Sequence, residues 1–266
     1  MPRQAQSGEA DRCRVCRGRL SRAPRGRRRR YCSDACRQRA YRRRHDGPPR
    51  RGLVKLYEAD AREFLTNLPD GSVDLIVTDP PYKFDRGDSR FREWFDETIP
   101  DAEWPAIFRE FHRVLDADSH AYVLGDYRVH LVFAEAARNA GFRVHTPLVW
   151  DKCSPGLGGL WRAQYELIGV FEKGRRRGNF KGRSTVLSVP RVVRRYPTEK
   201  PVALLRQLIS QSSDRGELVL DPFCGSGSTG RAARELGRRA LLCDLDAVCA
   251  ARKLRNDRVA PMDKRA

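Results

Sequence analysis

The sequence predicts an α/β fold in which a small N-terminal cysteine module precedes a doubly wound, mostly parallel sheet. Three observations support this class. Short apolar runs typical of buried strands alternate with longer helical patterns from residue 53 onwards. Two of those runs end abruptly in proline or glycine turns, which is where an open parallel sheet binds ligands. Clustered cysteines precede the alternation, in a stretch with few apolar residues.

Residues 1–46 are expected to form a basic, zinc-finger-like module. Its two cysteine pairs are spaced so that their thiolates can surround one Zn²⁺ ion. The expected ligands are Cys13, Cys16, Cys32 and Cys36, with His45 as an alternative to Cys36. Because the stretch lacks a hydrophobic core, metal binding would supply most of its folding free energy. The alternative is a disordered basic tail with incidental cysteines.

The N-terminal segment also carries most of the positive charge. Residues 1–50 contain 17 Arg and 4 acidic residues, so they carry +13 of the formal net charge of +19. A field of this sign and density suits a polyphosphate such as DNA. We expect Arg42 and Arg43, on a basic helix after the last cysteine, to contact phosphates rather than bases. Residues 47–52 form a stiff, polar linker that marks the domain boundary.

The elements of the second domain, residues 53–259, follow from the spacing of apolar residues. Pro105 suits the first turn of a helix, and Gly141 ends the helix that begins at Val129. We expect strands at 53–57, 73–78, 120–124, 142–150, 165–171, 217–220 and 240–243, and helices at 61–68, 105–115, 129–139 and 201–212, with further helices after the last two strands.

Two of these strand ends carry the candidate site. Asp79-Pro80-Pro81-Tyr82 follows the strand at 73–78, and Asp221-Pro222-Phe223-Cys224-Gly225-Ser226-Gly227-Ser228-Thr229 follows the strand at 217–220. The first turn offers oxygen acceptors beside an aromatic ring, which suits a planar substrate. The second is a glycine loop that opens a helix, which suits a small cofactor. Its glycines, with Gly230, also fit the dinucleotide pattern Gly-x-Gly-x-x-Gly, so an oxidoreductase is an alternative.

Together and in this order, the two motifs resemble those of amino-group DNA methyltransferases that use S-adenosylmethionine. Because the catalytic motif comes first, the chain is similar to the permuted members called beta class, from about Leu53 to Val259. The resemblance implies a Rossmann-like methyltransferase sheet. It also implies methylation of the N6 amino group of adenine in double-stranded DNA, because an acid such as Asp79 in the first catalytic position favours adenine. Cytosine-N4 methylation, RNA methylation and a catalytically inactive, zinc-dependent DNA-binding protein are the alternatives.

The resemblance also implies roles for individual residues. Asp79 and the Pro80 carbonyl would accept the two amino hydrogens, Pro81 would hold the turn, and Tyr82 would stack on a base flipped out of the duplex. The cofactor would be bound by Asp221, Pro222, Phe223, Gly225, Gly227 and Thr229, with Asp244 at its ribose, Lys200 at its methionyl carboxylate and Asp60 near its adenine. Residues 151–196 correspond to the target-recognition segment, in which Arg162, Arg175, Arg176 and Arg177 are candidate DNA contacts. Glu166 lies in a recurrent family motif, and the sequence indicates no role for it.

The sequence contains neither an apolar N-terminal segment typical of a signal peptide nor a run of about 20 apolar residues. We therefore expect a soluble, cytoplasmic protein, bacterial or phage-encoded and associated with the nucleoid, with no membrane partner. A monomer or a homodimer is expected. A cognate restriction endonuclease is a candidate partner.

Overall fold

The computed structural model describes residues 53–82, 98–156, 160–176, 178–192, 199–254 and 259–260, together with Cys13, Leu20 and Tyr31. The chain divides into two compact units, Met1–Arg50 and Arg51–Ala266. In the first unit Cys13 is buried. The other three predicted zinc ligands, Cys16, Cys32 and Cys36, lie outside the described residues. Within the described residues there is no group of three or more side chains suited to a metal ion.

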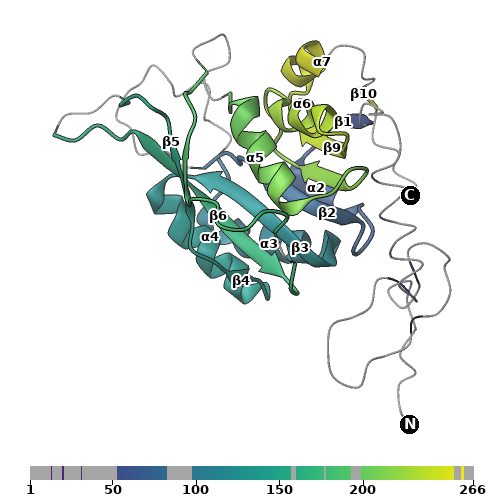
Figure 1. Cartoon of the computed structure of the whole chain (residues 1–266). Coiled ribbons are helices and arrows are strands. Elements are labelled where there is room, and N and C mark those ends of the chain that lie inside the picture. The colour runs from purple at the N-terminus through teal and green to yellow at the C-terminus, as the bar shows by residue number, and fades with distance from the viewer. Residues whose placement is uncertain are drawn as a thin grey trace. The chain divides into compact units, whose positions relative to one another are not determined.

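The second unit is built on one mixed sheet whose strands are mostly parallel (Figure 1). In spatial order the strands are β10 (Val259–Ala260), β1 (Val54–Glu58), β9 (Arg239–Asp244), β8 (Leu218–Asp221), β2 (Val73–Thr78), β3 (Leu115–Gly125), β6 (Tyr165–Lys173), β5 (Leu148–Asp151) and β7 (Val186–Ser188). Neighbours are parallel from β10 to β3, whereas β6 runs antiparallel to both β3 and β5. The predicted mostly parallel α/β sheet is therefore confirmed.

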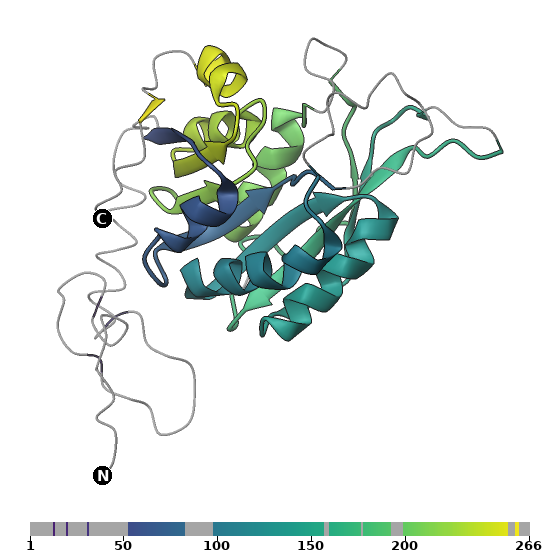
Figure 2. The ribbon, with the colours of Figure 1, turned by 180° about the vertical axis from the view of Figure 1, so that it is seen from behind.

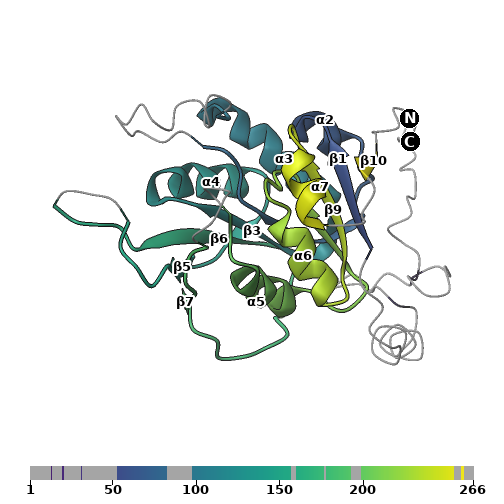
Figure 3. The same ribbon diagram turned by 90° about the horizontal axis from the view of Figure 1, so that it is seen from above.

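Helices cover both faces of this sheet. The helices α2 (Ala61–Thr66), α3 (Trp104–Val114) and α4 (Tyr127–Asn139) lie on one face (Figure 2), and Phe64, Phe108 and Phe133 place them in one hydrophobic core. The helices α5 (Val202–Ser212), α6 (Ser228–Glu235) and α7 (Val248–Leu254) belong to the core on the other face (Figure 3). A strand between two such layers is buried throughout, as all residues of β2 are. Among the described residues, every helix is too short or too polar to span a membrane.

One predicted strand is interrupted. Residues 142–150 form β4 (Arg143–Val144) and β5 instead of one strand, and both pieces pair with β6. The break comprises residues 145–147 and includes Pro147, which has no N–H group with which to continue the ladder. The short strand β7 is absent from the sequence-based prediction, because three residues are too few for an alternating pattern to be recognised.

Candidate active site

The two predicted motifs begin at neighbouring strand ends. The strands β2 and β8 are parallel, with Ile76 opposite Leu220. Thr78 Oγ1 donates a 2.7 Å hydrogen bond to Asp221 Oδ1, which joins the last residues of both strands. The turn that starts at Asp79 and the glycine loop that follows Asp221 therefore leave the same edge of the sheet side by side.

Asp79 belongs to a cluster of charged side chains. Lys200 Nζ donates a hydrogen bond to Asp79 Oδ2 and lies 3.6 Å from Glu166 Oε2. Lys152 Nζ lies 2.6 Å from Glu166 Oε1. The side chains of Lys200 and Glu166 are 12% and 17% exposed, so cations face carboxylates in a largely buried place. Both ammonium groups also lie over the Trp150 ring, 5.4 Å from its centroid for Lys152 and 6.0 Å for Lys200.

The charged groups of this cluster shift one another's pKa values. Burial raises the pKa of Asp79, and the nearby Lys200 opposes that rise. Burial also acts to raise the pKa of Glu166, but Lys200 and Lys152 outweigh it, so this pKa is lowered. Burial alone would lower the pKa of Lys200, yet the two carboxylates raise it above its ordinary value. Lys200 therefore stays protonated between them.

The other residues of the catalytic motif form a tight corner. Pro80 is buried, and the Pro81 carbonyl accepts a hydrogen bond from Ile99 N at 3.3 Å. Tyr82 is 4% exposed and packs in the same hydrophobic core as α3. Burial, and after it the charge of Asp79, raises the pKa of the Tyr82 hydroxyl. Because the ring is covered in this structure, its stacking on a base stays a prediction.

The glycine loop depends on two glycines for different reasons. Gly227 has a φ of +73°, a left-handed conformation that side chains disfavour, directly before α6. A Cβ atom on Gly230 would lie 2.5 Å from Leu242 Cδ1, so glycine lets α6 approach the sheet closely. Asp221 is buried at the start of the loop, and this burial raises its pKa to about 7. Of the other predicted cofactor contacts, Pro222 and Thr229 are buried and Phe223 is half-buried.

Asp244 is the last residue of β9, and Asp60 follows the adjacent strand β1. Asp244 Oδ2 accepts a 2.7 Å hydrogen bond from Gly225 N, so its carboxylate lies against the glycine loop. Asp60 caps α2 by accepting a 2.7 Å hydrogen bond from Arg62 N. The hydrogen bonds from the Arg62 side chain hold the pKa of Asp60 below its usual value. Asp244 thus lies against the glycine loop, and its contact with a ribose stays a prediction, whereas Asp60 has an evident structural role.

The predicted DNA contacts differ in their surroundings. Arg162 and Arg175 are exposed. Arg177, Arg42 and Arg43 lie outside the described residues.

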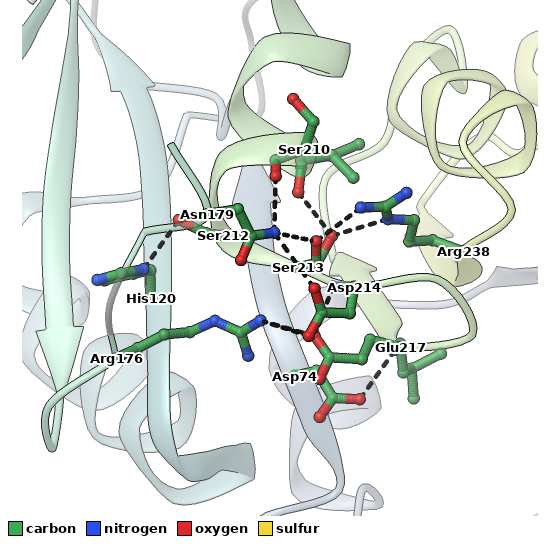
Figure 4. A network of polar contacts seen from close by, with 12 residues as sticks. Asp74, His120, Arg176, Asn179, Ser210, Ser212, Ser213, Asp214, Glu217 and Arg238 are labelled. Carbon is green, nitrogen blue, oxygen red and sulfur yellow. Dashed lines mark hydrogen bonds and ion pairs between the residues drawn. The ribbon is translucent and has the colours of Figure 1, made fainter. Parts of the chain in front are cut away.

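Arg176 is built into the interior. Its side chain is 7% exposed, and its guanidinium group donates a 2.9 Å hydrogen bond to Glu217 Oε2. Figure 4 shows the polar network that this pair joins, with Asp214 Oδ2 3.9 Å from the same guanidinium nitrogen. In that network Asn179 also donates to the carbonyl of Ser213 at 2.7 Å. The position of Arg176 fits a structural role instead of the predicted contact with DNA.

Several features of the charged cluster are missing from the sequence-based prediction. Lys200 is predicted to face the cofactor, but its ammonium group is bound to Asp79. Lys152 and Trp150 have no predicted role, and Glu166 has none either. The usable signals are Glu166 before the apolar part of β6 and Lys152 directly after β5. Neither signal indicates that the two side chains meet.

A parallel α/β sheet with a glycine loop beside an acidic proline corner defines a class of enzymes that bind a cofactor at the strand ends. A family model described as DNA methylase, with N6 and N4 in its name, matches residues 73–251. The chain therefore belongs to the N6/N4 DNA methylase family. This membership decides against the oxidoreductase alternative and places the chain among the DNA methyltransferases.

Two curated relatives and one solved structure illustrate the likeness. YubD of Escherichia coli (strain K12) is 34% identical over 196 residues, which cover 73% of this chain and 85% of YubD. DNA adenine methyltransferase YhdJ of the same strain is 27% identical over 224 residues, covering 69% and 76% respectively. TTHA0409 of Thermus thermophilus, solved with S-adenosyl-L-methionine, is 24% identical with a TM-score of 0.60, covering 79% of this chain and 100% of its own. This last likeness concerns the fold.

Proposed function

We propose that the protein transfers a methyl group from S-adenosylmethionine to the N6 amino group of adenine in double-stranded DNA. The observation that carries the proposal is the bond between Thr78 and Asp221, which sets the Asp79 corner beside the glycine loop. A direct transfer requires substrate and cofactor within bonding distance, and this adjacency allows it. The choice of adenine is supported by the acid at position 79 and by the likeness to YhdJ, a DNA adenine methyltransferase.

The difficulty of this reaction lies in the amino nitrogen, whose lone pair is delocalised into the base ring. The Asp79 carboxylate and the Pro80 carbonyl would accept the two amino hydrogens and draw the nitrogen towards tetrahedral geometry. The cofactor supplies a methyl group on a positively charged sulfur. Because the nitrogen loses its proton after the transfer, Asp79 acts as an acceptor and does not need to be a strong base.

The residues beside the glycine loop fit this cofactor. The Asp244 carboxylate, held against the backbone of Gly225, suits a pair of ribose hydroxyls. The left-handed Gly227 lets the loop backbone turn in the way that a close ligand approach requires. Asp244, Gly225 and Gly227 would therefore hold the cofactor, together with Phe223 beside them.

Replacing Asp244 with alanine should weaken S-adenosylmethionine binding by about 10-fold to 100-fold, because hydrogen bonds to a charged group are worth about 1.5–3 kcal/mol. Isothermal titration calorimetry measures this loss. Asp246→Ala is the matched control. Asp246 lies two residues further on and accepts a 2.9 Å hydrogen bond from Val248 N at the start of α7, so its loss should leave cofactor affinity nearly unchanged. Equal affinities in both variants would move the ribose contact elsewhere.

The experiment that tests the function is expression in a methylation-free host, followed by single-molecule sequencing of the host DNA. We expect N6-methyladenine at one recurrent sequence. N4-methylcytosine would show the cytosine specificity that the family also contains. Modified RNA with unmodified DNA would show an RNA methyltransferase, and no modification at all would favour an inactive DNA-binding protein.

The zinc module, residues 1–46, is a second part of the proposal and is supported by the spacing of its cysteines. If the metal orders a phosphate-binding helix, chelation should lower DNA affinity and reduce its dependence on salt concentration. Fluorescence anisotropy with and without a chelator, at several salt concentrations, measures both. An unchanged salt slope would contradict this role, and metal analysis of the purified protein should find about one zinc per chain.

A further inference from the structure

Lys200 lies between two carboxylates and binds them unequally. Its ammonium group donates to Asp79 Oδ2, but it stands 3.6 Å from Glu166 Oε2. That glutamate oxygen is buried and accepts no hydrogen bond from any residue that the structure describes. A buried acceptor in this state has lost water without full compensation. The oxygen therefore offers Lys200 a second binding position about an ångström from its present one.

The surroundings of this second position are fixed. Glu166 is held at its other oxygen by Lys152, at 2.6 Å, and it stands opposite Trp150 in the pairing of β5 with β6. Trp150 is buried and donates a 2.7 Å hydrogen bond from Nε1 to the carbonyl of Val189. Its ring faces the Lys200 ammonium group, which favours a cation there. Lys200 has a flexible four-carbon chain and lies close to both carboxylates, so its ammonium group can shift between them.

In the proposed reaction, the amino group of the target base and the Lys200 ammonium group compete for the Asp79 carboxylate. To localise the lone pair of the amino nitrogen, the carboxylate must accept an amino hydrogen while carrying its charge. An ammonium group on the same carboxylate neutralises that charge and occupies one oxygen. Losing the ammonium group altogether would leave Asp79 and Glu166 as neighbouring, largely buried anions, and one of them would take up a proton.

We propose that Glu166 is a positioning residue that receives the Lys200 ammonium group when Asp79 accepts the amino group of the target base. This inference rests on the proposed function. Lys200 passes from one carboxylate to the other, so the site holds the same cations and anions throughout. Glu166 keeps the Lys200 ammonium group inside the cluster, close to the ionised Asp79, when the direct bond between Lys200 and Asp79 is released. Glu166 and Lys200 thereby control when Asp79 is available, without touching the base themselves.

The charges around Asp79 determine the expected pH dependence. Burial raises its pKa, Lys200 and Lys152 lower it, and Glu166 raises it. Among the described residues, Asp221 on β8 and Tyr82 after β2 also interact with Asp79, and Asp126 before α4 interacts with Tyr82. Transfer requires an ionised Asp79, so activity should rise with pH through the pKa of this group. Removing the Lys200 charge should move the rise to higher pH, and removing the Glu166 charge should move it to lower pH.

The test compares Glu166→Gln and Lys200→Met by rates of methyl transfer to a duplex that contains the mapped site. The acid limb is the part of the pH profile in which kcat rises with pH. We expect its midpoint to move down by about one pH unit in Glu166→Gln and up by about one pH unit in Lys200→Met. In Glu166→Gln, kcat at its optimum should also fall about tenfold, because the amide oxygen is a weaker acceptor for Lys200. Lys200→Arg, which keeps the charge, should keep the wild-type limb.

Glu172→Gln is the matched control. Glu172 is a second buried glutamate on β6, and His145 Nε2 lies 2.9 Å from its Oε2 atom. The same chemical change on the same strand should leave kcat and its pH profile unchanged, because Glu172 lies six residues along β6 from Glu166, which faces the Asp79 cluster. A general loss of stability from removing a buried carboxylate would appear in both variants.

Binding gives a readout that is independent of catalysis. A duplex with purine in place of the target adenine lacks only the exocyclic amino group. The wild-type protein should show a preference for adenine that is measured relative to the variants, because the purine–thymine pair lacks one hydrogen bond and flips out more easily in every one of them. Glu166→Gln should lose most of that preference, because Lys200 then stays on Asp79, whereas Glu172→Gln should keep it. Fluorescence anisotropy measures the four affinities.

Acid limbs that stay in place in Glu166→Gln and Lys200→Met, or that move in the same direction, would overturn the proposal. So would an unchanged preference for adenine over purine in Glu166→Gln. If Lys200→Met does not fold, the comparison of Glu166→Gln with Glu172→Gln decides alone. A wild-type protein that transfers no methyl group at any pH would instead refute the proposed function.

Discussion

Replacing Asp79 with alanine is expected to reduce methyl transfer by roughly a thousandfold or more, because the variant loses an acceptor that acts in the transition state. Binding of S-adenosylmethionine should persist, since Asp244 and Gly225 bond each other without Asp79. The fold should persist as well, because Lys200 keeps Glu166 as a counter-ion 3.6 Å away. Transfer of a radiolabelled methyl group measures the first effect, and calorimetry measures the second.

The control for this variant is Asp101→Ala. Asp101 is an exposed acid in the 3₁₀-helix η3 (Asp101–Glu103), so its removal should leave both kcat and cofactor affinity unchanged. Retained activity in Asp79→Ala would remove Asp79 from the role of acceptor. Loss of cofactor binding together with activity would show that the substitution disturbs the whole corner.

Replacing Arg176 with alanine is expected to lower the free energy of unfolding by about 3–5 kcal/mol, because it removes the 2.9 Å ion pair between the guanidinium group and the buried Glu217. In a domain of this size the midpoint of thermal unfolding should fall by roughly 10 °C or more. Scanning calorimetry measures the change. At temperatures where the variant is folded, its DNA affinity should match that of the wild type.

Arg175→Ala is the matched comparison, since it removes the same side chain one residue earlier. Arg175 is exposed, and its backbone N–H, which the substitution keeps, donates to Asp118 Oδ1 at 2.9 Å. We expect stability within about 0.5 kcal/mol of the wild type and weaker binding to DNA. A stable Arg176→Ala protein, or one that loses DNA affinity as Arg175→Ala does, would contradict the structural role of Arg176.

The two strands that carry the site could be predicted from the sequence because residues that stop a strand follow each of them. Proline after Asp79 and glycine after Cys224 stop two apolar runs, and parallel strands bring such ends to one edge. Strand pairing on the other side of β3 could not be predicted in the same way. An apolar run such as β6 has no feature that tells a parallel neighbour from an antiparallel one.

The charged cluster and the buried arginine show a second limit. Patterns of apolar residues indicate which strands are buried, but they do not indicate which charged side chains compensate one another inside. Lys200 and Asp79 are 121 positions apart, and their bond depends on the whole sheet being assembled. Arg176 stands in a basic run that composition assigns to the surface, although the acid that binds it lies 41 positions away.

The pairing of β2 with β8 also limits when the proposed site can form during synthesis. Thr78 and Asp221 are separated by 143 positions, and β8 fills the place between β2 and β9. A ribosome must therefore extend the chain past Asp221 before β2 acquires this partner, so a shorter nascent polypeptide lacks the proposed site. A truncated product that stops short of β8 would leave an apolar strand edge uncovered in mid-sheet, and such products should be prone to aggregation and turnover.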